Sequence, residues 1–139
     1  MRKFLIATHG SFSAGIKTSL DMIIGEMGNV FIIQAYVNGN KSIDDELNEV
    51  LKNISDEDEL VIFSDLLGGS ITNQILRVAL KENIHTVSGF NLPLLIDILL
   101  ADTETPVNEV IETAIANAKE QIVYVNKLIT ANKEDNPDD

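Results

Sequence analysis

Apolar and polar positions along the chain predict short buried strands separated by amphipathic helices. Four short runs rich in Ile, Val, Leu and Phe have the composition of strands; they cover residues 3–8, 30–37, 59–64 and 85–88. Between and after these runs, apolar positions recur at helical spacing. The predicted helices cover about residues 13–26, 43–54, 70–82, 92–101 and 107–118. Strands that alternate with helices are typical of a parallel sheet with helical crossover connections.

Local signals refine the ends of these elements. Ser42 precedes the second predicted helix and Asp45 follows three residues later, in the position of a capping box. Residues 121–128 contain the β-branched run Ile122-Val123-Tyr124-Val125, which favours an edge strand, although this segment also fits an extension of the last helix. Residues 131–139 are polar. We therefore expect one domain over residues 1–130, followed by a polar C-terminal tail.

The pattern predicts a single-domain α/β fold: a flavodoxin-like open sheet of four parallel strands in the order 2-1-3-4, with flanking helices and a C-terminal edge strand. Ligands of such sheets bind beyond the carboxyl ends of the strands, where the strand order reverses. The first and third strands would be neighbours at that point. His9 and Asp65, which follow them, would then face each other, whereas only Asn38-Gly39-Asn40 follows the second strand.

Composition narrows the classes of function. The 139 residues are 45% hydrophobic, which is enough for a packed core. The formal net charge of −12 argues against binding nucleic acid, because that binding depends on Lys and Arg neutralising phosphates. Cysteine is absent, and two His without a carboxylate cluster do not make a metal site, so we expect no metal and no cofactor. The opening apolar run is too short for an export signal, and no run is long enough to span a membrane, which predicts a cytoplasmic protein.

The residues that follow the first and third strands suit phosphoryl chemistry. An imidazole attacks phosphorus through an unprotonated ring nitrogen, and a carboxylate on the other nitrogen fixes the tautomer and stabilises the imidazolium. His9 and Asp65 are candidates for these two roles. The turn Gly68-Gly69-Ser70 at a predicted helix start offers free backbone N–H groups to phosphate oxygens. Alone, each of these residues is also compatible with an ordinary loop, cap or turn, and it is their combination that favours a site.

Four other residues are not expected to take part in the chemistry directly. Three residues that border the predicted strand ends are candidates for the rim of the site: Thr8, Gly10 and Asn91. His85 lies at the amino end of its strand, away from this edge of the sheet, and is interpreted as structural or exposed.

Three motifs, taken together, resemble those of a known family. They are Thr8-His9-Gly10, Asp65-Leu66-Leu67-Gly68-Gly69-Ser70-Ile71-Thr72-Asn73 and Gly89-Phe90-Asn91-Leu92-Pro93-Leu94-Leu95. In order and spacing the chain resembles the enzyme IIA component of the mannose family of the bacterial sugar phosphotransferase system, from Met1 to about Thr130. Ile71 departs from the family, which commonly has Pro there; Pro only pre-sets φ at a helix start, so this change bears little on the chemistry.

The resemblance implies a phosphoryl carrier. His9 would accept phosphate from the phosphocarrier HPr and pass it to a histidine of enzyme IIB, with Asp65 orienting the imidazole. It also implies a homodimer that exchanges a C-terminal edge strand, which fits residues 121–128. IIB is expected as a separate polypeptide, and the membrane components IIC and IID would connect the protein to the membrane only indirectly. The transported sugar is not identified by these residues.

Three other functions are compatible with parts of this pattern. A phosphotransfer subunit of dihydroxyacetone kinase has a similar fold and the same His chemistry, but the Gly68-Gly69-Ser70 turn fits the mannose type better. A histidine phosphatase would share His9-Gly10, but position 8 is Thr, and only Arg2 and Arg77 exist to hold a phosphate. A non-catalytic regulatory module would not need both His9 and Asp65.

Overall fold

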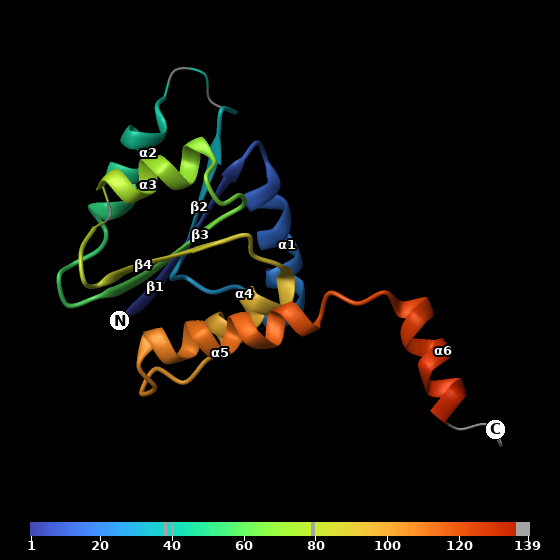
Figure 1. The fold of residues 1–139 in the computed structure, drawn as a ribbon. Coiled ribbons are helices and arrows are strands. Elements are labelled where there is room, and N and C mark those ends of the chain that lie inside the picture. The colour runs from blue at the N-terminus through green and yellow to red at the C-terminus, as the bar shows by residue number, and fades with distance from the viewer. Residues whose placement is uncertain (38, 40, 79, 136–139) are drawn as a thin grey trace.

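Four parallel strands form one sheet, as the sequence predicts (Figure 1). The computed structural model describes residues 1–37, 39, 41–78 and 80–135. The strands are β1 (Arg2–His9), β2 (Val30–Ala35), β3 (Glu59–Ser64) and β4 (Ile84–Ser88). Their order is β2-β1-β3-β4, and every pair is parallel. The sequence-based order 2-1-3-4 is therefore confirmed, and β1 has a neighbour on each side.

Helices cover both faces of the sheet. They are α1 (Phe12–Ile24), α2 (Ile43–Leu51), α3 (Ser70–Val78), α4 (Leu92–Leu99), α5 (Val107–Glu120) and α6 (Val125–Asp135). In Figure 1, α2 and α3 lie on one side of the sheet and α1, α4 and α5 on the other. None of the helices in the described ranges combines the length and apolar character needed to cross a membrane.

Successive residues of β1 belong to different cores, because side chains of a strand point alternately to its two faces. Phe4 and Ile6 pack with apolar residues of α1, α4 and α5. Leu5 and Ala7 pack with those of α2 and α3. All four side chains are buried, as expected for a central strand of a sheet covered on both faces. This packing holds the end of β1 in a fixed position.

Two strand boundaries differ from the prediction at the carboxyl edge of the sheet. His9 is the last residue of β1 rather than the first residue of a loop, and its backbone pairs with that of Ala35. β2 ends at Ala35 instead of residue 37, because Tyr36 has a φ of +67° that turns the chain out of the extended conformation. Of the predicted turn at 38–40, Asn38 and Asn40 lie outside the described residues.

The strand predicted at residues 121–128 is not formed in the isolated chain. Gln121 ends α5 in a turn, and α6 begins at Val125. In Figure 1 this segment leads away from the sheet towards α6. Local hydrogen bonds replace a ladder: the Lys127 and Leu128 N–H groups donate to the Tyr124 carbonyl at 3.1 and 3.2 Å. Exchange with a second copy is not tested by a single chain and stays a prediction.

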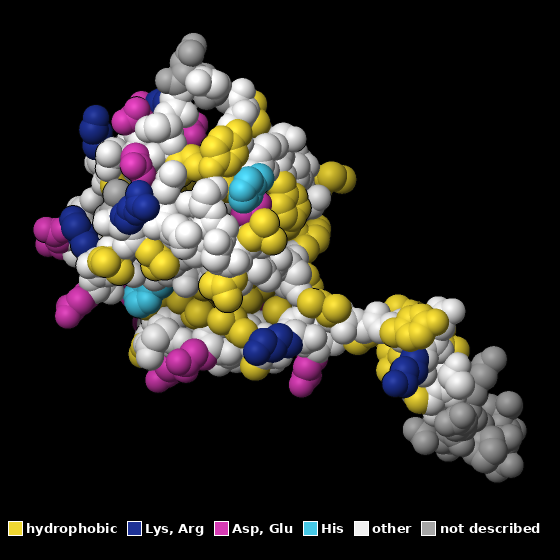
Figure 2. Space-filling model, turned by 45° about the horizontal axis from the view of Figure 1, so that its top comes forward, with side chains coloured by type: hydrophobic (Ala, Val, Ile, Leu, Met, Phe, Trp, Pro, Cys, Tyr) yellow, Lys and Arg dark blue, Asp and Glu magenta, His cyan; other side chains and the backbone are white. Residues whose placement is uncertain are grey.

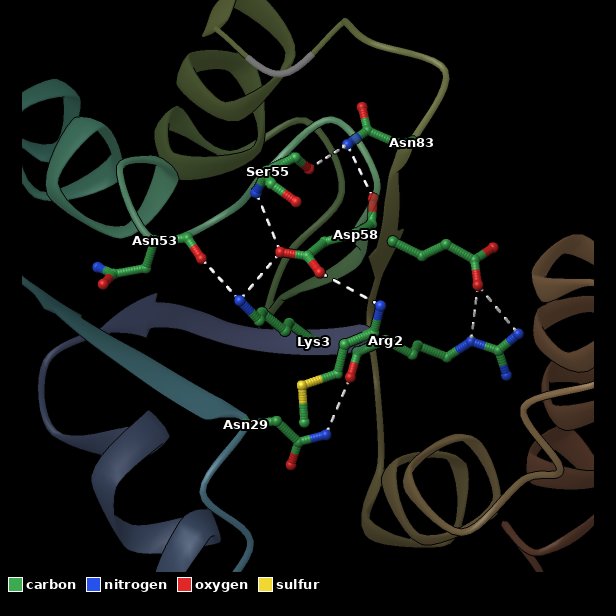
Figure 3. A network of polar contacts seen from close by, with 9 residues as sticks. Arg2, Lys3, Asn29, Asn53, Ser55, Asp58 and Asn83 are labelled. Carbon is green, nitrogen blue, oxygen red and sulfur yellow. Dashed lines mark hydrogen bonds and ion pairs between the residues drawn. The ribbon is translucent and has the colours of Figure 1, made fainter.

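An ionic cluster joins the amino ends of β1 and β3 (Figure 3). Asp58, which is 9% exposed, lies just before β3. Its Oδ1 contacts the Met1 amine at 3.2 Å, and its Oδ2 accepts from Lys3 Nζ at 2.9 Å and from the Ser55 N–H at 3.0 Å. The hydrogen bond from Ser55, followed by that from Lys3, holds the pKa of the Asp58 carboxyl far below its usual range. We call Met1, Lys3, Ser55 and Asp58 the amino-edge cluster.

Candidate functional site

His9 ends the central strand at the point where the strand order reverses. The chain connects β1 to β2 on one side and returns to β3 on the other, which is where open parallel sheets bind ligands. The next residue, Gly10, has a φ of +58° and donates its N–H to the Ala35 carbonyl at 2.9 Å. Glycine adopts this left-handed conformation without a steric penalty. The turn therefore leaves the His9 side chain at the carboxyl edge, 41% exposed.

Asp65, the first residue after β3, holds His9 by two contacts to one oxygen. Its Oδ2 accepts from the His9 backbone N–H at 2.9 Å and lies 2.9 Å from His9 Nδ1. The Asp65 side chain is only 12% exposed. The predicted neighbours across the switch point are thus in direct contact.

The electrostatics of this pair determine which ring nitrogen carries the proton. Burial raises the pKa of Asp65, but the hydrogen bonds from the His9 backbone and ring and the attraction to His9 outweigh it and leave the pKa below its ordinary value. Asp65 is therefore a carboxylate at neutral pH, and a carboxylate only accepts hydrogen bonds. Nδ1 must then carry the hydrogen, which leaves a lone pair on Nε2 of the neutral ring.

The second oxygen of Asp65 is not used. Asp65 Oδ1 is buried and has no hydrogen-bond partner among the residues that the structure describes. Most buried polar atoms in proteins are paired, because an unpaired one costs desolvation energy. Both hydrogen-bond contacts between this carboxylate and another described residue are made with His9.

The loop from Asp65 to Ser70 brings the start of α3 close to the imidazole. Gly68 has a φ of +76°, which favours glycine there. A Cβ on Gly69 would lie 3.8 Å from His9 Cε1, so the backbone at position 69 lies against the ring. The hydroxyl of Thr72 fixes the conformation of this loop. Its Oγ1 donates to the Leu66 carbonyl at 2.6 Å and lies 2.8 Å from Ser64 Oγ.

The amino end of α3 is suited to an anion. The first backbone N–H groups of a helix have no partner within the helix, and they carry the positive end of its dipole. The first turn of α3 contains no acidic residue that would compete for them. Gly69 lies near His9, and free N–H groups at the start of a helix are a common binding site for negative oxygens.

The three residues expected at the rim have structural contacts. Thr8 is fully buried, and its Oγ1 accepts from the Ser13 N–H at 2.7 Å in the first turn of α1. Asn91 caps α4: its Oδ1 accepts from the Leu94 N–H at 3.0 Å, and its Nδ2 donates to the Ala118 carbonyl at 3.1 Å. Gly10 forms the turn after β1, so each of the three has a structural contact, and their place at the rim of the site stays a prediction.

Sequence reasoning missed Tyr36. Its ring centroid lies 5.7 Å from that of His9, and its hydroxyl oxygen lies 2.6 Å from Ser70 Oγ. The sequence predicts a second strand over residues 30–37, which places Tyr36 inside the strand. Only residues that follow a strand are considered as site candidates, so Tyr36 is not among them. If the strand were predicted to end at Ala35, as it does in the structure, Tyr36 would be the first residue after it and a site candidate.

Large apolar side chains are exposed around this edge. They are Phe12, Tyr36, Val37, Leu66 and Leu67, each at least half exposed. Figure 2, in which this edge is turned towards the viewer, shows yellow side chains gathered beside a histidine. An apolar patch around a polar centre is typical of a surface that binds another protein.

Together these features suit nucleophilic attack by the ring of His9. With Nδ1 facing Asp65, the lone pair of Nε2 points away from that carboxylate, and the backbone at Gly69 lies near the same ring. The site is a shallow, half-exposed edge rather than a closed pocket. Its geometry suits a group that is delivered and removed by other macromolecules.

Comparison with known proteins gives consistent matches. A family model described as "PTS system fructose IIA component" (EIIA-man) matches residues 3–115. The chain is 24% identical to the PTS system fructose-specific EIIA component of Bacillus subtilis (strain 168), over 100% of this chain and 99% of that protein. It is 26% identical to the PTS system mannose-specific EIIAB component of Escherichia coli (strain K12), over 85% of this chain and 38% of that protein.

A solved structure extends the match to three dimensions. It is a candidate permease of the phosphoenolpyruvate-dependent sugar phosphotransferase system (PTS) from Klebsiella pneumoniae subsp. pneumoniae. Its TM-score to this chain is 0.86 at 33% identity, with 92% of this chain and 93% of that chain covered.

Proposed function

The chain belongs to the EIIA-man family of PTS IIA components, and we propose that within this family it carries a phosphoryl group on Nε2 of His9. It is thus a component of a sugar phosphotransferase system, as the family and its relatives indicate. The observation that carries the proposal is the 2.9 Å contact between His9 Nδ1 and a charged Asp65. This contact leaves Nε2 as the nucleophilic nitrogen of a half-exposed ring.

The proposed reaction is a direct displacement at phosphorus. The Nε2 lone pair of His9 forms the new N–P bond, while the bond from phosphorus to the donor breaks and its electron pair returns to the donor. The proton stays on Nδ1, facing Asp65, so the ring becomes a positively charged phosphoimidazolium. In the second transfer an acceptor nitrogen attacks the same phosphorus, and the electron pair of the N–P bond returns to Nε2.

The start of α3 is proposed to hold the phosphoryl oxygens. Backbone N–H groups at Gly69 and Ser70 and the Ser70 hydroxyl are fixed donors, which reorganise little when charge develops. The turn at Gly68 brings them to the ring. This arrangement would stabilise the phosphoryl group both in transit and while it is carried.

The partners follow from the family. The donor is the phosphocarrier HPr, and the acceptor is an enzyme IIB component; the relative from Escherichia coli is described as an EIIAB component, which joins A and B parts in one name. The apolar residues around His9 offer a surface for both partners in turn. The protein would act in the cytoplasm and contact the membrane components IIC and IID only through IIB.

A histidine phosphatase is disfavoured by the positions of the two arginines. Arg2 is 6% exposed at the opposite edge of the sheet, where it contacts Glu59 at 3.3 Å and donates to the carbonyls of Asp102 and Thr105. Arg77 lies in the last turn of α3, at the far end from Ser70. Neither is therefore at the His9 edge, where a phosphatase would need an arginine to clamp phosphate.

Labelling tests the proposal. His9→Ala should abolish transfer of phosphate from phosphorylated HPr, whereas His85→Ala, which removes the second histidine of the chain, should be labelled like the wild type. The bound phosphate should be lost in acid and kept in base, as expected of phosphohistidine. Base-labile phosphate that persists in the His9→Ala protein would overturn the proposal.

A homodimer is a second part of the proposal. Beyond α5 the chain exposes a run of apolar side chains, which are Ile122, Val123, Tyr124, Val125, Leu128 and Ile129. We expect this arm to be covered by a second copy, with residues 121–128 pairing at an edge of its sheet. Sedimentation of the full chain and of a chain ending at Gln121 tests this. A full-length monomer at micromolar concentration would refute it.

A further inference from the structure

Tyr36 has an unusual backbone conformation for its residue type. It is the one non-glycine residue with positive φ, +67°, among the residues that the structure describes. A bulky side chain in the left-handed region is unfavourable, and it persists where the surrounding contacts impose it. The contacts of Tyr36 are therefore informative.

Those contacts connect β2 to the proposed phosphoryl site. The ring of Tyr36 lies 5.7 Å from the His9 ring between centroids, at an angle of 37°, and its hydroxyl oxygen lies 2.6 Å from Ser70 Oγ. The imidazole thus has Asp65 at Nδ1, the backbone of Gly69 near Cε1 and the phenol beside it. A left-handed turn at position 36 brings the side chain to this place at the very end of β2.

Either hydroxyl of this pair can be the donor, and the choice determines where the other hydrogen points. Each hydroxyl has one hydrogen to donate and two lone pairs that accept. When the more acidic Tyr36 phenol donates to Ser70 Oγ, the hydrogen of Ser70 is released to donate elsewhere. Ser70 is the first residue of α3, where phosphoryl oxygens would bind.

We propose that Tyr36 is a positioning residue for phosphoryl transfer. Its ring restricts the His9 imidazole to the orientation in which Nδ1 faces Asp65. Its hydroxyl donates to Ser70 and thereby directs the Ser70 hydrogen to a phosphoryl oxygen. The inference rests on the proposed carrier function but assigns roles beyond it.

The competing explanation is that Tyr36 only contacts a partner protein, because its side chain is 61% exposed. The next residue offers a matched control: Val37 is 57% exposed on the same turn. A pure contact residue would change KM for phosphorylated HPr and leave kcat unchanged. A positioning residue would change kcat and the stability of the phosphoryl group.

Kinetics of four variants separate these roles. Tyr36→Phe keeps the ring and removes the hydroxyl; it should lower kcat by about five-fold, the effect of one hydrogen bond, and leave KM unchanged. In a Ser70→Ala background the same change should have no further effect, because Tyr36 acts through Ser70. Val37→Ala should change KM alone. A Tyr36→Phe protein with the kcat of the wild type, or an undiminished effect in the Ser70→Ala background, would overturn the hydroxyl role.

The ring is tested on the unphosphorylated protein. Nitrogen-15 NMR of the two imidazoles reports the tautomer of His9, with His85 as the internal reference. Tyr36→Leu should shift His9 from the Nδ1–H form towards a mixture of tautomers, whereas Tyr36→Phe should keep the form of the wild type. An unchanged His9 tautomer in Tyr36→Leu would overturn the ring role. Failure of HPr to label the wild type would instead refute the carrier function, and the NMR comparison would still decide the position of the ring.

Discussion

Two carboxylates at opposite edges of the same sheet use their oxygens differently. At the amino edge, Asp58 has partners on both oxygens: the Met1 amine on Oδ1, and Lys3 and the Ser55 N–H on Oδ2. At the carboxyl edge, Asp65 receives both of its contacts from His9 on Oδ2 alone, while Oδ1 is buried without a partner among the described residues.

The difference separates a carboxylate that stabilises the fold from one suited to chemistry. Both have a lowered pKa, so that shift does not by itself identify the functional edge. What differs is the partner. The partner of Asp58 is the ammonium group of Lys3, whose side chain is 21% exposed, whereas the partner of Asp65 is the ring of His9, which is 41% exposed and has a second nitrogen. An incompletely satisfied carboxylate weakens stability and is retained where the geometry serves a reaction.

The largest expected effect comes from Asp65→Asn. The change keeps the shape but removes the charge that stabilises the imidazolium formed on transfer. We expect the rate of transfer from phosphorylated HPr to fall by about 10²–10³-fold, less than the roughly 10⁴-fold cost of the corresponding change in a serine-protease triad, because here the histidine is itself the nucleophile. Single-turnover labelling measures this. A variant that is labelled at the rate of the wild type would show that Asp65 is only a structural residue.

Asp58→Asn should give the opposite result. It removes the charge that attracts Lys3 and the Met1 amine, so we expect Tm to fall by several degrees while the transfer rate stays that of the wild type. Thermal unfolding of Asp58→Asn beside Asp65→Asn, with labelling of both, makes the comparison. If Asp58→Asn slowed transfer as much as Asp65→Asn, the two edges would not be functionally separate.

Lowering the pH should reduce the free energy of unfolding, and it should do so less in Asp58→Asn than in the wild type. Because both carboxyls have a lower pKa in the folded protein than in the unfolded chain, the unfolded chain binds protons more readily. Their contribution to stability is therefore complete above about pH 4, the ordinary range of Asp, and is lost as the pH falls below it. Urea unfolding near neutral pH and at about pH 3 measures the loss. It should be smaller in Asp58→Asn, and an equal loss in variant and wild type would exclude Asp58 as a source.

Hydrophobic periodicity and strand ends were sufficient to predict the sheet order and the meeting of His9 with Asp65. His9 ends β1 and Asp65 follows β3, and because these parallel strands are neighbours, the topology brings the two residues together. The capping role of Ser42 was also predictable, because it depends on local sequence: its Oγ accepts from the Asp45 N–H at 3.1 Å.

Features that depend on tertiary context were not predictable. The left-handed turn at Tyr36 contradicts local preference and accompanies contacts with His9 and Ser70, which are distant in sequence. The side-chain amide of Asn91 donates to the Ala118 carbonyl at the end of α5, a contact between residues that are distant in sequence. The β-branched run at 122–125 favours a strand only where an edge is available; in the isolated chain residues 122–124 are irregular and α6 begins at Val125.

Salt should have the smallest effect and should act on one edge only. The net charge of −12 attracts a basic phosphocarrier at long range. Dissolved ions limit this attraction to the Debye length, which is about 30 Å at 0.01 M salt and about 3 Å at 1 M. We expect the second-order rate constant of transfer from HPr to fall a few-fold across this range, because salt weakens the association and not the transfer step within the complex.

The ion pair between Asp58 and Lys3 should respond less to salt. The two side chains are 11% and 21% exposed, so dissolved ions screen this pair poorly. The Tm difference between the wild type and Asp58→Asn should therefore stay nearly constant as salt rises. Stopped-flow kinetics and thermal unfolding across the same salt series test both parts. A transfer rate indifferent to salt would remove electrostatic steering from the carboxyl edge, and a Tm difference that vanished with salt would show that the amino-edge cluster is held by weak surface charge.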